Sequence, residues 1–207
     1  PTTSPTPSPT PTPTTSFNTA EYQQSAYAVS AGAITAYQNG ASGQGVKIGI
    51  IDSGINPNLA EFAGRIDMQN SGDVAGNRGI SDEGGHGTAV SAVAAAARNN
   101  SGTMGVAYNA TIVSMRADDP GSCADTSEDG GCYFLDSDIA EGIAIAHAAG
   151  ARVINMSLGG GSPNAAVIAA IQAAVADGVV FVISAGNDGE TPEGGNPDPF
   201  ALVPAQQ

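Results

Sequence analysis

Four short apolar runs, separated by longer helical patterns, limit most strongly what this chain can fold into. The runs are rich in Val and Ile and are too continuous for half-exposed strands, which is typical of strands buried on both faces. Strand and helix thus alternate, and this alternation predicts an α/β fold with a mostly parallel sheet, right-handed crossovers and helices on both faces. The expected strands cover 46–51, 111–115, 152–156 and 179–184.

The segments between these runs carry apolar residues at helical spacing. In one of these segments we expect Ser162 to be the N-cap and Pro163 the first helical residue. This helix is expected to end at Gly178. A shorter helix is expected before the first strand, where an Asn-Gly pair supplies an ending signal. The remaining expected helices cover roughly 31–38, 87–98 and 136–149.

Composition separates the first sixteen residues from the rest. Residues 1–16 contain only Pro, Thr and Ser, so they cannot bury apolar surface and favour extended polyproline II geometry. We interpret 1–16 as a disordered, semi-stiff spacer and 17–207 as a domain long enough to bury a sizeable core.

The charge balance excludes some classes of partner. With six Lys plus Arg against twenty Asp plus Glu, the formal net charge is −14, which would repel nucleic acid and anionic membrane surfaces. No run of about twenty apolar residues is present, so no transmembrane segment is expected in this chain.

Two cysteines bear on the compartment. Cys123 and Cys132 flank a polar loop at a spacing that suits a small disulfide ring but not a four-ligand zinc site. A disulfide is favoured over two free thiols, and with it an extracytoplasmic location: secreted, cell-surface or periplasmic.

Three polar residues stand at the ends of the expected elements. Asp52 follows the first buried strand, His86 lies among glycines at a helix start, and Asn187 follows the last strand. Singly, each has an ordinary interpretation as a helix cap, a surface histidine or a turn residue. Because sites in such sheets form at the carboxyl edge, the three together indicate a catalytic site.

Four motifs in order, GIIDSGI, GGHGTAV, VINMSLGG and VISAGNDG, resemble those of the subtilisin-like (S8) serine peptidases. The preceding segment is most similar to subtilases carried by bacterial autotransporters. The resemblance implies a three-layer α/β/α fold and a serine endopeptidase that cleaves a polypeptide substrate through an Asp-His-Ser triad and an acyl-enzyme.

The resemblance also implies a role for each motif. Asp52 would be the acidic triad member, His86 the general base and Asn187 the side-chain donor to the oxyanion. Ser157, Leu158 and Gly159 would form a substrate-pairing strand edge, and Ser184, Ala185 and Gly186 would wall the primary specificity pocket.

One family feature is missing. The nucleophilic serine of this family lies in a downstream Gly-Thr-Ser motif, which this sequence lacks. We therefore expect a fragment without the C-terminal part of the domain, nearly inert alone and with apolar faces uncovered, with a downstream autotransporter or other C-terminal domain as a candidate continuation. The alternative is a catalytically inactive subtilase-fold binding module. A nucleotide-binding domain is disfavoured because no G-x-G-x-x-G follows the first strand.

An acidic segment leaves two interpretations open. It would either favour basic substrate residues on the non-prime side of the cleft or be a solvated loop. Its oxygen ligands would also suit structural calcium, but without ordered ligand spacing we assign no metal and no cofactor. The acidic residues are Asp118, Asp119, Asp125, Glu128, Asp129, Asp136, Asp138 and Glu141.

Overall fold

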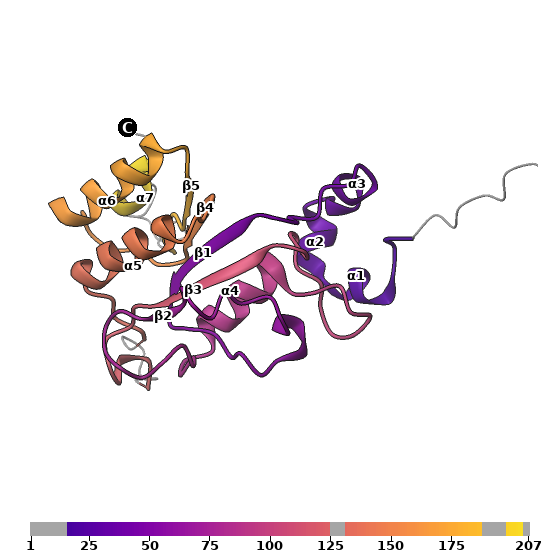
Figure 1. Ribbon diagram of the computed structural model, residues 1–207, viewed down its shortest axis with the longest axis horizontal. Coiled ribbons are helices and arrows are strands. Elements are labelled where there is room, and N and C mark those ends of the chain that lie inside the picture. Colours follow the sequence, from indigo (N-terminus) through magenta and orange to yellow (C-terminus); the bar gives the residue numbers. More distant parts are fainter. Residues whose placement is uncertain (1–15, 125–130, 188–197, 205–207) are drawn as a thin grey trace, which may run out of the picture.

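The computed structural model describes residues 16–124, 131–187 and 198–204, and it contains one five-stranded sheet. The strand order is β2-β3-β1-β4-β5 and every neighbouring pair is parallel (Figure 1). All four predicted strands are present, and the short β2 is an addition. The strands are β1 Lys47–Asp52, β2 Gly72–Asp73, β3 Thr111–Arg116, β4 Val153–Met156 and β5 Val180–Ile183.

Helices cover both faces of this sheet, as predicted. Helices α5 and α6 pack together on one face, and α4 packs against β1 and β3 on the other (Figure 1). The helices are α1 Ala20–Gln24, α2 Ala26–Ser30, α3 Ala33–Gln38, α4 His86–Ala95, α5 Asp136–Ala148, α6 Ala165–Ala176 and α7 Pro199–Leu202.

The central strand β1 is buried on both sides. Ile51 belongs to the core under α5 and α6, whereas its neighbour Ile50 belongs to the core under α4. Because successive side chains of a strand point to opposite faces, a continuous apolar run can fill both cores. This arrangement is the predicted three-layer α/β/α fold.

The start of α6 differs from the prediction. Its N-cap is Asn164, and the expected Ser162 and Pro163 lie before the helix. Asn164 is the N-cap because its Oδ1 accepts hydrogen bonds from the backbone N–H groups of Ala166 and Val167, at 2.9 and 3.1 Å.

Two of the N-terminal helices were not predicted. Sequence spacing indicated one helix near 31–38, which corresponds to α3, whereas α1 and α2 precede it. Tyr22 of α1 and Ala28 of α2 belong to one buried cluster, in which the Tyr37 ring meets Tyr22 and Tyr108 edge-on, at centroid distances of 6.2 and 5.0 Å. These tertiary contacts stabilise helices of only five residues.

Strand β5 leaves apolar surface uncovered, as expected. Val180 and Val182 are 58% and 51% exposed. Val182 also lines an apolar hollow of about 630 Å³ together with Val90, Val93 and Val153. Within the described residues, no helix is long and apolar enough to cross a membrane. Residues 1–15 of the expected spacer lie outside the described ranges.

Candidate active site

Asp52 and His86 meet where β1 ends and α4 begins. His86 Nδ1 lies 2.8 Å from Asp52 Oδ1, a hydrogen-bond distance. The Asp52 side chain is 1% exposed, whereas that of His86 is 54% exposed. The pair therefore joins a buried carboxylate to an imidazole that is open to the surface.

The buried carboxylate is supported by its neighbour. Asp52 Oδ1 accepts hydrogen bonds from the Ser53 backbone N–H, at 2.7 Å, and from the Ser53 hydroxyl, at 3.2 Å. The hydrogen bond from His86 to Asp52 outweighs partial burial and raises the pKa of His86 above its ordinary value of 6.5.

Asp82 fixes the first turn of α4. Its Oδ1 accepts from the Gly85 N–H at 2.8 Å and from the Ser53 hydroxyl at 2.9 Å, and its Oδ2 accepts from the Thr88 N–H and hydroxyl at 2.8 and 2.6 Å. The Gly87 N–H donates to the Ser53 hydroxyl at 3.0 Å. These bonds satisfy the free N–H groups of the helix start and hold His86 over Asp52.

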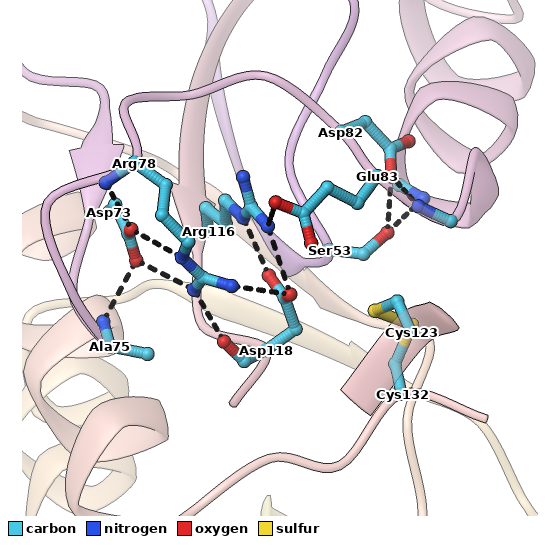
Figure 2. A network of polar contacts seen from close by, with 12 residues as sticks. Ser53, Asp73, Ala75, Arg78, Asp82, Glu83, Arg116, Asp118, Cys123 and Cys132 are labelled. Atoms are coloured by element: carbon cyan, nitrogen blue, oxygen red, sulfur yellow. Dashed lines mark hydrogen bonds and ion pairs between the residues drawn. A yellow bond between two sulfur atoms is a disulfide. The ribbon is translucent and has the colours of Figure 1, made fainter. Parts of the chain in front are cut away.

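Arg116 anchors the loop before α4 (Figure 2). It ends β3 in register with Asp52 and is 1% exposed. Its guanidinium donates to the Ser81 carbonyl at 2.6 Å and lies 2.9 Å from Glu83 Oε1. Burial disfavours the charge, but hydrogen bonds to Asp118 and Glu83 outweigh it and raise the pKa of Arg116.

Asp118 completes this network (Figure 2). It is fully buried and accepts from Arg116 Nε at 2.8 Å and from Arg78 Nη1 at 2.9 Å. Arg78 also pairs with Asp73, at 2.9 Å. Asp118 is thus neither solvated nor free for a substrate, which corrects both sequence interpretations for this residue. Asp125, Glu128 and Asp129 lie outside the described residues.

The predicted disulfide is present. Cys123 and Cys132 are bonded, and a β-carbon on Gly84, two residues before His86, would stand 3.2 Å from Cys123 Cβ and 3.3 Å from Cys132 Sγ. A cavity of about 340 Å³ is lined by this disulfide, His86, Phe134 and Ser157, among others. The disulfide is therefore part of the wall beside the histidine.

The other predicted motifs meet His86 in one cleft. A hollow of about 400 Å³ is lined by His86, Ser157, Gly159, Ser184, Gly186, Asn187 and Asp198. Two of its walls are joined by the Ser184 hydroxyl, which donates to the Leu158 carbonyl at 2.7 Å. Parallel strands bring these residues together because β1, β4 and β5 end at the same edge.

Leu158 and Ala185 do not line this hollow themselves. The Leu158 side chain is 7% exposed and packs in the core under α5 and α6, and Leu158 lines a neighbouring pocket of about 340 Å³ together with Gly159 and Phe200. Ala185 does not line the hollow, and its carbonyl accepts from the Asp198 N–H at 3.0 Å.

Sequence reasoning missed several supporting residues. Ser53 and Thr88 lie inside two of the quoted motifs, and Asp82 lies shortly before a glycine-rich helix start, where an acidic residue is a capping signal. Asp198 precedes Pro199 as the N-cap of α7, a helix-start signal, but nothing in its local sequence places it beside His86. In the described ranges, no group of three or more His, Cys, Asp or Glu side chains is arranged to hold a metal ion.

Comparison with known proteins identifies the family. The subtilase family of peptidases (S8) matches residues 43–205. The chain belongs to the subtilase family. It is 37% identical to subtilisin DY of Bacillus licheniformis over 155 residues and 37% identical to thermitase of Thermoactinomyces vulgaris over 154 residues, and each match covers 73% of the chain.

Solved subtilase structures agree with this fold. A protease of Pseudoalteromonas arctica matches with a TM-score of 0.65 and 30% identity, covering 83% of this chain and 59% of that one. A cold-adapted subtilisin-like serine proteinase matches with a TM-score of 0.57 and 33% identity, covering 71% and 48%. The matched region spans 51% and 50% of the lengths of subtilisin DY and thermitase.

Proposed function

We propose that this chain is part of a serine endopeptidase that hydrolyses peptide bonds through an acyl-enzyme. The observation that carries the proposal is the 2.8 Å contact between His86 Nδ1 and the buried Asp52 in a subtilase. Such a pair fixes the imidazole tautomer and stabilises the imidazolium, so that Nε2 can take a proton from a serine hydroxyl.

The cleft supports roles for the remaining residues. Asn187 lines it together with His86, so its amide is a candidate donor to the oxyanion. The backbone of Ser157, Leu158 and Gly159 would pair with the substrate, and Ser184, Ala185 and Gly186 would wall the pocket for the residue before the scissile bond. This chemistry uses side chains and backbone groups, and we propose no cofactor for it.

We place the nucleophilic serine in a longer form of the protein. In the described part of the chain, no serine hydroxyl is hydrogen-bonded to His86, and the sequence has no Gly-Thr-Ser motif. The disulfide supports an extracytoplasmic location. The spacer and a downstream autotransporter or other C-terminal domain remain predictions from the sequence.

The test is activity-based labelling of the full-length gene product. A fluorophosphonate probe is expected to label one serine outside residues 1–207, and His86→Ala is expected to abolish that labelling. The labelled peptide is located by mass spectrometry. A folded full-length protein that takes up no label would point instead to the inactive binding module.

A further inference from the structure

The carboxylate of Asp198 lies between two glycine-containing walls of the cleft beside His86. Its Oδ2 accepts a hydrogen bond from the Gly160 N–H at 2.9 Å. On the opposite wall, a β-carbon on Gly186 would stand 2.6 Å from Asp198 Oδ1. The carboxylate therefore fits only because this wall carries no side chain at that place.

Gly159, on the wall that also contains Gly160, likewise leaves room for the Asp198 carboxylate. A β-carbon on Gly159 would overlap Asp198 Oδ2, and the conformation of Gly186, with φ of +86°, is one that other residues rarely adopt. The backbone N–H of Asp198 is in turn tied to the Ala185 carbonyl at 3.0 Å. Both walls thus hold the carboxylate in a fixed place.

Asp198 is the acidic group among the described residues that line the cleft with His86. The other described lining residues are Ser, Gly and Asn. Within the described residues, no Lys or Arg forms an ion pair with Asp198. Its Oδ2 is bonded to Gly160, which leaves Oδ1 as an acceptor for a bound group.

We propose that Asp198 selects a cationic side chain, Arg or Lys, for the residue immediately before the scissile bond. The inference rests on the proposed peptidase function. The carbonyl under attack must lie beside His86, so the side chain of the same residue enters the cleft that His86 and Asp198 both line. There, a guanidinium or ammonium would form a charge-assisted hydrogen bond with the carboxylate.

Physical chemistry disfavours other side chains at that position. A large apolar group would remove water from the carboxylate without replacing its hydrogen bonds, which is costly. An acidic group would be repelled. A long cationic side chain instead brings its own hydrogen-bond donors into contact with Asp198.

The experiment uses full-length protein and tetrapeptide anilides that differ only in their last residue: Arg, Lys, Leu, Phe, Ala or Glu. We expect kcat/KM to be at least about tenfold higher for Arg and Lys than for Leu and Phe, as a desolvated charge pair would give. Asp198→Asn keeps the acceptor oxygen for Gly160 but removes the charge. It should lower kcat/KM for Arg and Lys at least about tenfold and leave Leu unchanged or improved.

Two controls separate recognition from folding. Glu141→Gln removes a negative charge from an exposed position on α5 and should leave the Arg preference intact. The rate of fluorophosphonate labelling, which does not require a cationic side chain, should be equal in the parent and Asp198→Asn. An Asp198→Asn protein that labels normally but has lost the Arg preference supports the proposal.

The failing outcomes are distinct. Cleavage with equal or greater preference for apolar or small residues, or an Arg preference that survives Asp198→Asn, overturns the role of Asp198 alone. Absence of both cleavage and labelling overturns the proposed function, and the specificity inference falls with it.

Discussion

The α-carbon of Gly87 lies against the carbonyl oxygen of Gly54, with no room for a β-carbon between them. A β-carbon at that place would also stand 3.1 Å from Asp52 Oδ1. Because this close approach lets α4 begin beside the end of β1, the two glycines set the distance between His86 and its carboxylate partner.

We predict that Gly87→Ala forces α4 away from β1. Stability should fall by about 1 to 3 kcal/mol, the usual cost of overpacking, and the pKa of His86 should decrease as its bond to Asp52 lengthens. Urea unfolding and NMR titration measure the two effects. Gly161→Ala is the control, because a β-carbon there meets nothing within 4 Å. Equal stability of both variants would contradict the prediction.

Asp52→Asn should lower the pKa of His86 toward 6.5, because the hydrogen bond to the carboxylate is the main cause that raises it. The chain has two histidines, so NMR titration in a His147→Asn background reports His86 alone. In full-length protein, turnover should fall by about 10⁴-fold. A His86 pKa that does not change would show that the carboxylate has no influence on the imidazole.

The pH dependence of activity and that of stability should run in opposite directions. Since the base must be neutral, kcat/KM is expected to rise with pH through a midpoint above 6.5. The raised pKa stabilises the fold fully below pH 6.5, and this contribution is lost as the pH rises through the pKa of His86 in the folded protein. Urea unfolding of the parent and His86→Asn from pH 5 to 9 checks the second point: a constant difference would refute it.

Asp118→Asn should leave the buried guanidinium of Arg116 and the partly buried one of Arg78 without their shared carboxylate. We expect stability to fall by about 3 kcal/mol or more, as for other broken buried ion pairs. Asp119→Asn is the matched control, since Asp119 is adjacent but exposed. Chemical unfolding curves that coincide for the two variants would count against the network.

Replacing Cys123 and Cys132 together by Ser should reduce stability by about 2 to 3 kcal/mol, from the chain entropy of the short ring. The disulfide lines the cavity beside His86, so KM for peptide substrates should rise more than kcat falls. Steady-state kinetics of full-length protein, compared with and without reductant, gives the same comparison. A loss confined to kcat would mean that the disulfide acts on the catalytic groups and not on substrate binding.

Local patterns indicated where the candidate site lies, and the family resemblance supplied the expected roles of its residues. Asp52 ends a continuous apolar strand and His86 begins an Ala- and Val-rich helix, so their meeting at one sheet edge is expected from the alternation of strand and helix. Asn187 was located in the same way, from the end of the last apolar run.

Contacts between distant segments could not be predicted. The contacts of Arg116 with Ser81 and Glu83 depend on how the loop before α4 packs against the end of β3. The placement of Asp198 depends on the space that Gly159 and Gly186 leave for its carboxylate. The N-cap of α6 was misplaced for a smaller reason: Ser162-Pro163 and Asn164 all carry helix-start signals, and only the geometry of Asn164 decides between them.

Among the described strands β1 comes first in the chain, yet it lies in the middle of the sheet, where Ile48 pairs with Ile112 on one side and with Val153 on the other. During translation, this apolar segment therefore leaves the ribosome before β3 and β4 have been synthesised, by on the order of ten seconds at ordinary rates of translation. During that interval its two edges are free to pair with other nascent chains. The yield of folded protein should thus depend on chaperone access to 46–51 as well as on the stability of the finished fold.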